Sequence, residues 1–233
     1  MQRTKAPKAV VFDFGGVLCF HPPDEKFAPI AKIFGLPVSE LIPLFWANRA
    51  EYDAARLDAW TYWNDIARLP GKTLNDSMMQ ELTRHEVALW NNYDERVLGW
   101  AAYLRASGFR TGILSNLPPA LGAELRATPG FLDLFDHVTF SYELKSVKPE
   151  PAIYADAIRG LDVAPGEALF LDDRPDNVEG ARAVGMIAEV FKSWEDFLSF
   201  APSRYNLPVD GLEADGIRGA IPNRAGLSTT PDA

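Results

Sequence analysis

Six polar residues of this 233-residue chain stand where apolar runs end or helical patterns begin, and they are the residues best suited to chemistry. They are Asp13, Ser115, Asn116, Lys148, Asp172 and Asp173. Adjacent carboxylates repel one another, and a hard divalent cation such as Mg²⁺ offsets that cost by taking carboxylate, water and phosphate oxygens as ligands. A lysine ammonium and a serine hydroxyl suit the binding of an anion such as phosphate. The set therefore indicates a metal site beside a phosphate-binding group.

Each of these residues also has an ordinary structural interpretation. Asp172 or Asp173 could cap the helix that follows, because aspartate is a preferred N-cap residue. Lys148, like Lys145, could be a solvated surface lysine, and a Ser-Asn pair alone is a weak signal. A helix cap explains one aspartate but not three carboxylates at the ends of apolar runs, so we favour the metal site.

Short apolar runs alternate with helical patterns along most of the chain. The runs cover residues 8–13, 109–115, 138–141, 168–172 and 186–191. The helical patterns cover residues 94–106, 118–127, 151–159 and 175–184. Buried parallel strands are apolar on both faces, so this alternation predicts an α/β fold with a parallel sheet. Ligands of such sheets bind beyond the carboxyl ends of the strands, where the six polar residues would meet.

The segment after the first apolar run breaks this alternation. It shows helical patterning, no convincing strand and many aromatic residues, which we interpret as its own core rather than as a cofactor site. We therefore expect a catalytic core of residues 1–20 and 93–204 with an inserted all-helical cap of residues 21–92. Residues 205–233 are rich in Gly, Pro, Asp and Ala and poor in large apolar side chains, which predicts a disordered tail.

The net charge of -9 and the pI of about 4.9 argue against two classes of partner. Proteins that bind nucleic acid or anionic membranes usually present a basic face, and this sequence has no dense basic run, so we expect neither. The single cysteine, Cys19, excludes an intramolecular disulfide and suits a reducing compartment. The N-terminus is polar, and no apolar run is long enough to span a bilayer. We expect a cytoplasmic protein that acts on a small molecule, and its oligomeric state is left open.

Four segments carry a resemblance to a known family. They are residues 12–18 (FDFGGVL), 113–116 (ILSN), 147–154 (VKPEPAIY) and 170–181 (FLDDRPDNVEGA). In this order they resemble the four motifs of the haloacid dehalogenase-like (HAD) superfamily, over roughly residues 8–200. The resemblance implies a Rossmann-like core with a helical cap inserted after the first strand. The most similar subgroup is that of small capped phosphatases that act on sugar phosphates such as glucose 1-phosphate.

The resemblance also implies a role for each polar residue. Asp13 is the nucleophile that forms an aspartyl-phosphate, and covalent catalysis of this kind splits hydrolysis into two easier steps. Asp13, Asp172 and the backbone carbonyl of Gly15 hold Mg²⁺, with Asp173 as a further, water-mediated partner. Three more residues bind the phosphoryl group and stabilise its charge: Ser115, Asn116 and Lys148. The implied activity is Mg²⁺-dependent removal of phosphate from a small phosphate ester.

One position departs from the pattern of the superfamily. In most of its phosphatases the residue two after the nucleophile is an aspartate that protonates the leaving group and then activates water. Here that residue is Gly15, and loss of a general acid or base typically costs about 10²–10⁴-fold in rate. We favour a phosphatase that takes its proton from water, the substrate or a cap residue, because the sugar phosphatases that it resembles carry glycine here too.

Other interpretations stay open. A metal-independent 2-haloacid dehalogenase needs no proton on its leaving halide, but dehalogenases of the superfamily lack a pair like Asp172 and Asp173. A catalytically degenerate domain that binds a ligand without turnover is disfavoured, because the polar set is retained. Another phosphoryl transfer is a minor alternative.

The cap is expected to set the selectivity for substrate. Candidates for contact with substrate are Arg49, Trp46, Tyr52 and His85. Arg49 could bind an anionic or hydroxyl-rich group, and could equally pair with Glu51 or Asp53 at the surface. His21 lies just past the first strand and is a candidate for the missing general acid.

Overall fold

A five-stranded parallel sheet lies at the centre of the molecule. The structure is a computed structural model and describes residues 6–209. The strand order is β3-β2-β1-β4-β5, and every neighbouring pair is parallel. The strands are β1 (Ala9–Phe12), β2 (Arg110–Ser115), β3 (His137–Phe140), β4 (Ala168–Asp172) and β5 (Ile187–Val190). These bounds lie within one residue of the predicted runs, so the predicted α/β fold with a parallel sheet is confirmed.

The central position of β1 determines which side chains meet. All four residues of β1 are fully buried, and the strand pairs with β2 on one side and with β4 on the other. Phe12 is in register with Ile113 of β2 and Leu171 of β4. Because the strands are parallel, the residues that follow them emerge at the same edge of the sheet.

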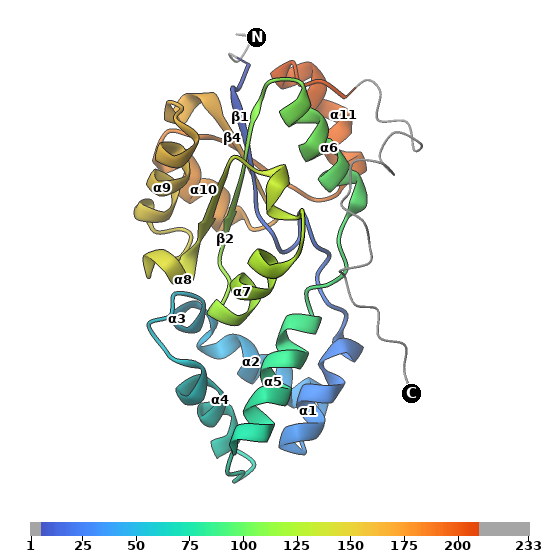
Figure 1. Ribbon diagram of the computed structural model, residues 1–233, viewed down its shortest axis with the longest axis vertical. Helices are drawn as coiled ribbons and strands as arrows, with labels where there is room; N and C mark the ends of the chain where they lie inside the picture. The colour runs from blue at the N-terminus through green and yellow to red at the C-terminus, as the bar shows by residue number, and fades with distance from the viewer. Residues whose placement is uncertain (1–5, 210–233) are drawn as a thin grey trace.

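Helices cover both faces of the sheet (Figure 1). On one face lie α6 (Glu95–Ala106) and α11 (Trp194–Tyr205), and Phe12 packs edge to face on Trp100 of α6. On the other lie α9 (Pro151–Leu161) and α10 (Pro175–Ala183), which share a buried cluster with Val11. The side chains of successive residues of β1 thus point to opposite faces of the sheet, as expected for a strand. The shorter α7 (Pro119–Ala127) and α8 (Ser141–Leu144) follow β2 and β3.

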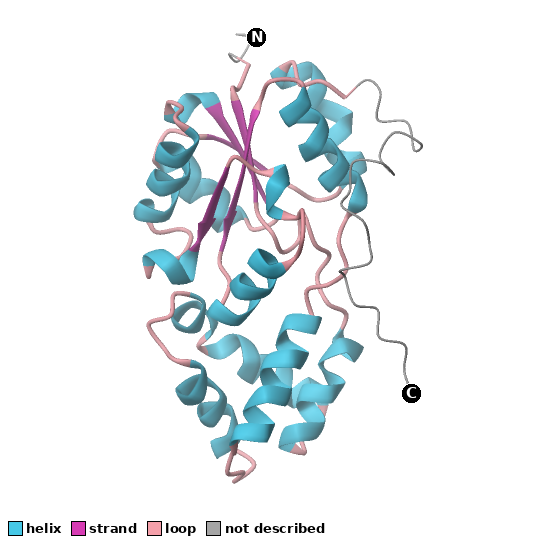
Figure 2. Cartoon of the chain, viewed as in Figure 1, coloured by secondary structure: helices cyan, strands magenta, loops and turns pink. Residues whose placement is uncertain are grey.

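A layer of five helices lies beyond the carboxyl ends of the strands (Figures 1 and 2). This helical layer comprises α1 (Ala28–Phe34), α2 (Val38–Ala47), α3 (Arg49–Asp53), α4 (Ala59–Arg68) and α5 (Asp76–Ala88), all between β1 and β2 in the chain. Its interior is aromatic: Phe34 stacks on Trp63, which also contacts Phe45 and Tyr62. These aromatic residues are buried, as expected, but they belong to the same hydrophobic cluster as Phe12 of the sheet and Trp100 of α6, so they do not form a separate core.

Two chain crossings join the helical layer to the sheet. The Phe20 backbone N–H donates to the Asn92 carbonyl at 2.8 Å, and that of Asp94 donates to the Leu18 carbonyl at 3.0 Å. The crossings therefore pair with each other, so the two connections form one junction.

The first residues of the predicted tail pack against the sheet's helices. Tyr205 ends α11, Leu207 is buried, and the Trp100 indole N–H donates to the Pro208 carbonyl at 3.0 Å. The rest of the predicted tail, residues 210–233, lies outside the described residues.

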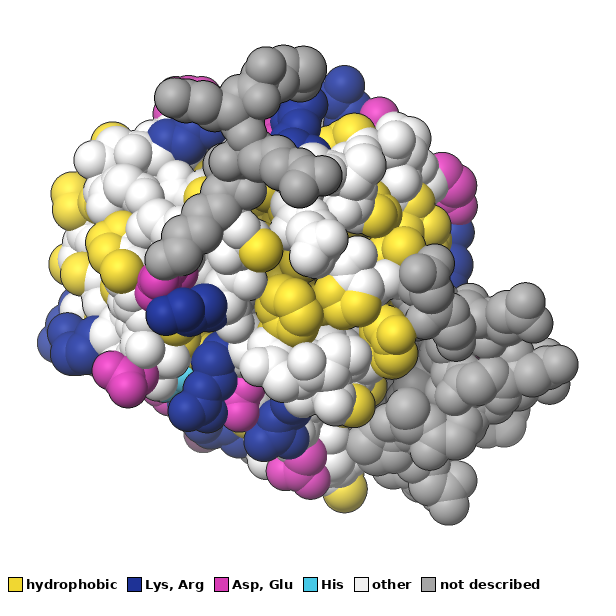
Figure 3. All heavy atoms as spheres, turned by 90° about the horizontal axis from the view of Figure 1, so that it is seen from above, with side chains coloured by type: hydrophobic (Ala, Val, Ile, Leu, Met, Phe, Trp, Pro, Cys, Tyr) yellow, Lys and Arg dark blue, Asp and Glu magenta, His cyan; other side chains and the backbone are white. Residues whose placement is uncertain are grey.

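Two surface properties bear on possible partners. On the face seen in Figure 3, lysine and arginine side chains lie beside acidic and apolar ones. Among residues 6–209 no single helix has the length and apolar character needed to cross a membrane, and only one bent pair, Asp24–Phe34 with Val38–Ala47 at 90°, passes by length and composition.

Candidate active site

Lys148 lies between two aspartates at the carboxyl edge of the sheet. Its Nζ is 2.7 Å from Asp13 Oδ1, 2.7 Å from Asp172 Oδ2 and 3.1 Å from the Leu114 carbonyl oxygen, to which it donates. Lys148 is only 4% exposed, so this is a buried ammonium and not a surface lysine. The ammonium offsets part of the repulsion between the two carboxylates.

Asp13 is held through one of its two carboxylate oxygens. Oδ1 accepts from the Phe14 backbone N–H at 2.6 Å and from the Ser115 hydroxyl at 2.8 Å, in addition to its contact with Lys148. Within residues 6–209, Oδ2 accepts no hydrogen bond. The carboxylate is thus fixed in orientation and retains one oxygen with its lone pairs available.

Asp172 is held by the helix that follows it as well as by Lys148. Its Oδ1 accepts from the Arg174 backbone N–H at 2.8 Å, and the Asn177 amide donates to both oxygens at 3.0 Å. The N-cap residue of α10 is Arg174, and the helix has no side-chain cap, so the interpretation of Asp172 as a helix cap is wrong. Asn177 lies within the fourth motif but was given no role from the sequence. Its signal is its place in the first turn of α10, five residues after Asp172.

Three carboxylates come together as a possible cation site. Asp13, Asp172 and Asp173 each offer one oxygen, and the three oxygens lie within 4.8 Å of one another. Asp173 is more exposed, and its Oδ2 lies 2.9 Å from His21 Nε2. Gly16 (φ +78°) lies against both, since a Cβ there would be 2.6 Å from Asp173 Cγ. Hard oxygen donors at this spacing fit a divalent cation such as Mg²⁺.

Burial and charge shift the pKa values of the site in different directions. Burial raises the pKa of Asp13 to about 7, against the opposing effect of the Lys148 charge. Burial also acts on Asp172, but the charge and hydrogen bond of Lys148 prevail and lower its pKa. Burial acts to lower the pKa of Lys148, and the two aspartates raise it instead. The ammonium is therefore firmly protonated, while Asp13 is poised for an ionisation that a cation would favour.

Asn116 contacts the backbone of Lys148. Its Oδ1 accepts from the Lys148 backbone N–H at 2.8 Å, and its Nδ2 donates to the Lys148 carbonyl at 3.2 Å. The amide therefore fixes the loop that carries the ammonium. Binding of phosphate by Asn116, predicted from the sequence, stays a prediction, and its side chain already serves this second purpose.

Arg49 is buried in the helical layer and lies between two carboxylates. Its Nε is 2.8 Å from Asp53 Oδ1 and its Nη1 is 2.7 Å from Glu86 Oε1, while Tyr52 donates to Glu86 at 2.9 Å. Only 7% of Arg49 is exposed, so it is not a solvated surface arginine. The structure does not bring its guanidinium into hydrogen-bond contact with Asp13. Contact of Arg49 with substrate stays a prediction, and it requires loss of one of these ion pairs.

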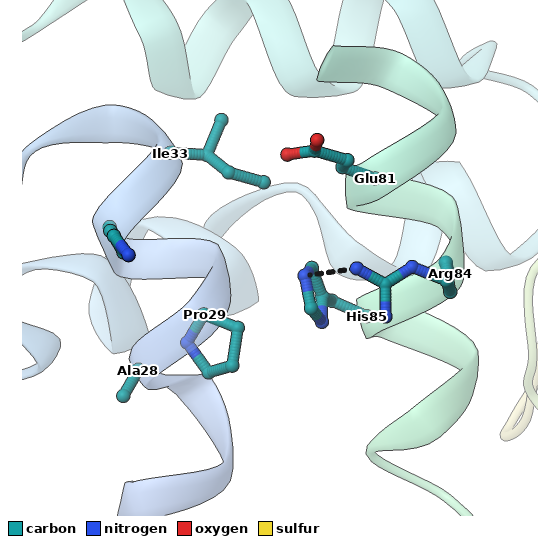
Figure 4. A pocket seen from close by; sticks show the side chains of 7 residues that line it. Ala28, Pro29, Ile33, Glu81, Arg84 and His85 are labelled. Atoms are coloured by element: carbon teal, nitrogen blue, oxygen red, sulfur yellow. Dashed lines mark hydrogen bonds between the residues drawn. The ribbon is translucent and has the colours of Figure 1, made fainter. Parts of the chain in front are cut away.

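His85 lies apart from the aspartates, in an open pocket on the helical layer (Figure 4). The pocket lies between α1 and α5, and Arg84 Nη2 is 3.0 Å from His85 Nε2. Its lining residues are Ala28, Pro29, Lys32, Ile33, Glu81, Arg84 and His85. None of these residues is one of the three aspartates of the possible cation site, so this pocket is separate from the candidate active site. Trp46, another candidate for contact with substrate, has a side chain that is 43% exposed.

The chain is similar in sequence to several known proteins. The sequence model for haloacid dehalogenase-like hydrolases matches residues 7–185. The chain is 36% identical over 215 residues to (S)-2-haloacid dehalogenase 1 of Pseudomonas sp. (strain CBS-3), covering 86% of this chain and 92% of that protein. It is 27% identical over 187 residues to D-ribitol-5-phosphate phosphatase of Bacteroides thetaiotaomicron, covering 76% and 88%.

A solved structure shares the fold. It is a HAD family enzyme of Bacteroides thetaiotaomicron, crystallised with magnesium and inorganic phosphate, with a TM-score of 0.68 and 19% identity, covering 82% of this chain and 98% of that one. The family match covers well over half of the chain and includes β1, β2, β4 and the loop of Lys148. The chain therefore belongs to the haloacid dehalogenase-like hydrolases.

Proposed function

We propose that this hydrolase is a Mg²⁺-dependent phosphatase that removes phosphate from a small phosphorylated metabolite. The observation that carries the proposal is the buried group in which Lys148 lies 2.7 Å from both Asp13 and Asp172, with Asp173 beside them. This group combines a nucleophile, oxygen ligands for a cation and a charge for a phosphate. The relative named D-ribitol-5-phosphate phosphatase supports a small phosphate ester as the substrate.

The donor set fits Mg²⁺ in its chemistry. Asp13, Asp172 and Asp173 would hold the ion, with the Gly15 backbone carbonyl as a further ligand. Mg²⁺ prefers hard oxygen ligands and usually retains water and substrate oxygens in its coordination shell. When bound, the ion supplies positive charge to the phosphate oxygens.

In the first chemical step, Asp13 Oδ2 attacks phosphorus. The bond from phosphorus to the leaving oxygen breaks, its electron pair stays on that oxygen, and an aspartyl-phosphate forms on Asp13. Water then attacks the phosphorus, the bond to Oδ2 breaks, and inorganic phosphate leaves with Asp13 restored. Ser115 and Lys148 orient Asp13 and lie where they can stabilise the charge on the phosphoryl oxygens.

We also propose that the helical layer acts as a cap over this site. Arg56 Nη2 donates to both oxygens of Glu150 at 2.6 and 2.7 Å, and its Nε donates to the Lys145 carbonyl at 3.1 Å. The Ser141 hydroxyl donates to the Asp53 carbonyl at 2.5 Å. These contacts join α3 and the turn that follows it to α8 and to the loop that carries Lys148, so opening the cap requires that they break.

The proposal is tested by measuring phosphate release from a panel of small phosphate esters, with Mg²⁺ and with excess chelator. We expect release that needs Mg²⁺ and that is lost in Asp13→Asn. Asp24→Asn is the matched control, because Asp24 is an exposed aspartate just before α1 and outside this group. Release that persists unchanged in chelator contradicts the proposal.

A 2-haloacid dehalogenase is the second candidate, supported by the 36% identical relative and by the absence of a side chain at Gly15. A halide departs without a proton, so such an enzyme needs no acid at that position. The buried Asp172 and its neighbour Asp173 count against it, since added carboxylates repel an anionic haloacid. Metal-independent chloride release from 2-chloropropionate, without phosphate release from any ester, favours the dehalogenase.

A further inference from the structure

The ring of Trp90 fills the space beside Gly15. A Cβ built on Gly15 would lie 3.0 Å from Trp90 Cζ3, 3.4 Å from Cη2 and 3.8 Å from Cε3. The backbone of Gly15 is not in the left-handed region, so its conformation accepts other residues. The neighbouring ring, rather than the backbone, therefore restricts this position. Any side chain there requires that Trp90 move.

Contacts with the helical layer and with the junction to the sheet hold Trp90 in place. It comes two residues after the end of α5, and its backbone N–H donates to the Val87 carbonyl at 3.1 Å. Two residues later, the chain pairs with Phe20 through the Asn92 carbonyl. The residue is 8% exposed, and its ring lies 6.1 Å from that of His21, centroid to centroid, at 66°. Because the junction fixes the backbone and burial confines the side chain, the ring cannot swing aside at little cost.

The part of the indole that faces Gly15 is apolar. The three nearest atoms are carbons of the six-membered ring, and none can donate a proton. Gly15 is two residues from Asp13, at the position where other members of the superfamily place the acid for the leaving group. The wall of the site at this position is thus made of aromatic carbon.

We infer that Gly15 and the Trp90 ring that fills its side-chain space together determine the class of leaving group that the enzyme accepts, because they leave no room for an acid at this position; the inference rests on the proposed phosphatase function. When the bond from phosphorus breaks, the leaving oxygen keeps both electrons. With a carbon wall in place of an acid, it departs as an anion and takes its proton from water afterwards. The substrates favoured are esters of weakly basic oxygens, such as aryl and acyl phosphates, over simple alkyl phosphates.

The basicity of the leaving oxygen sets the size of this preference. An alkoxide is about as basic as hydroxide, whereas phenol oxygens have a pKa of about 10 and carboxylates about 4. A general acid removes most of that difference and typically contributes about 10²–10⁴-fold. We therefore expect kcat/KM for an alkyl phosphate to fall below that for an aryl phosphate by about this factor.

The first experiment compares nitrophenyl, phenyl and benzyl phosphates with Mg²⁺. Phenyl and benzyl phosphates are similar in size, but only benzyl phosphate releases an alkoxide. We expect a rate loss of about 10²–10⁴-fold from phenyl to benzyl phosphate. Equal rates for phenyl and benzyl phosphate overturn the inference. If the two rates are similar in the wild type but differ in His21→Asn, His21 supplies the proton, and the inference is overturned as well. No release even from nitrophenyl phosphate instead means that the proposed function fails.

The second experiment asks whether Trp90 is the obstacle. Gly15→Asp alone is expected to leave the ratio of phenyl to benzyl rates unchanged or to inactivate the enzyme, because the indole blocks the new carboxyl. Gly15→Asp with Trp90→Ala is expected to raise the benzyl rate relative to phenyl by at least about tenfold. Trp90→Ala and Trp90→Phe alone leave the ratio high. A ratio of phenyl to benzyl rates close to one in Gly15→Asp alone overturns the inference.

A stability cycle keeps the inference testable if the aspartate variants do not fold. Gly15→Ala adds one methyl group against the ring, so it is expected to lower the urea midpoint in the wild-type background. In the Trp90→Ala background, where the ring is absent, the same change is expected to have little effect. An equal loss in both backgrounds shows that the ring does not restrict residue 15 and overturns the inference.

Discussion

Replacing Lys148 by methionine removes a buried charge while keeping most of the side-chain volume. Lys148 Nζ lies 2.7 Å from carboxylate oxygens of both Asp13 and Asp172, and the residue is 4% exposed. Removing one partner of a buried ion pair costs about 3–5 kcal/mol, because the other charge stays buried without compensation. We expect a loss of this size from the free energy of unfolding at pH 8 without Mg²⁺.

The loss is expected to depend on pH with a definite sign. Burial already raises the pKa of Asp13 to about 7, and loss of the ammonium raises it further above the unfolded value of about 4. The folded variant then binds more protons than the unfolded chain between about pH 4 and the raised folded pKa. Its stability therefore falls as pH rises through this window, and the deficit is smaller at pH 6 than at pH 8.

Urea unfolding followed by tryptophan fluorescence at pH 6 and pH 8, with and without Mg²⁺, measures both effects. Mg²⁺ is expected to restore part of the stability at pH 8, since the cation takes over the charge of Lys148. Lys145→Met is the matched control, because that side chain is exposed, and it should change stability by no more than about 0.5 kcal/mol. Equal urea midpoints for Lys148→Met and wild type at pH 8 refute the reasoning.

Three further predictions follow from the geometry. Arg49→Met is expected to destabilise the protein by about 3–5 kcal/mol in urea unfolding, because it leaves the buried Asp53 and Glu86 without the guanidinium charge. Asp53→Asn is expected to cost less, because the guanidinium keeps Glu86 as a partner, and equal losses contradict this. Asn116→Ala is expected to lower kcat/KM by up to about 10²-fold by displacing Lys148, and an unchanged value shows that the amide is dispensable. Activity is expected to fall as pH drops through the pKa of Asp13, and this fall should move to lower pH as Mg²⁺ rises, because the cation competes with the proton; a fall that does not move counts against a metal on Asp13.

The elements of the sheet could be predicted because their environment leaves a strong pattern in the sequence. A parallel strand covered on both faces is apolar throughout, as β1 and β4 are. The helix α11 was missed, and it contains Pro202, a residue that usually ends a helical pattern.

The site could be predicted where a residue directly follows a strand. Asp13 and Ser115 meet because β1 and β2 are neighbours in parallel register, and the Lys148 ammonium joins them from a loop. Two residues were missed: Asn177 orients Asp172 from the first turn of α10, and Trp90 reaches Gly15 from the far end of the insertion. The contact of Trp90 depends on packing between distant segments, which spacing along the chain does not reveal, whereas Asn177 lies near Asp172 in the sequence.

The burial of Arg49 is a similar case. Its partner Glu86 lies 37 residues further along the chain, in α5, and only the packing of the helical layer brings the two together. From the sequence, an arginine near Glu51 and Asp53 has the appearance of a surface residue or a substrate contact. Its actual environment explains why a charged residue is tolerated among buried aromatic side chains, since Asp53 and Glu86 pair with its charge and Tyr52 donates to Glu86.

The central claim is that Asp13 becomes phosphorylated during turnover. The most direct test mixes the enzyme with nitrophenyl phosphate and Mg²⁺, quenches the reaction in acid within one turnover, and identifies the modified peptide by mass spectrometry. We expect one phosphoryl group on Asp13, absent in Asp13→Asn and present in the control Asp24→Asn. Phosphate release at the wild-type rate by Asp13→Asn, or a phosphoryl group on another residue, contradicts the claim.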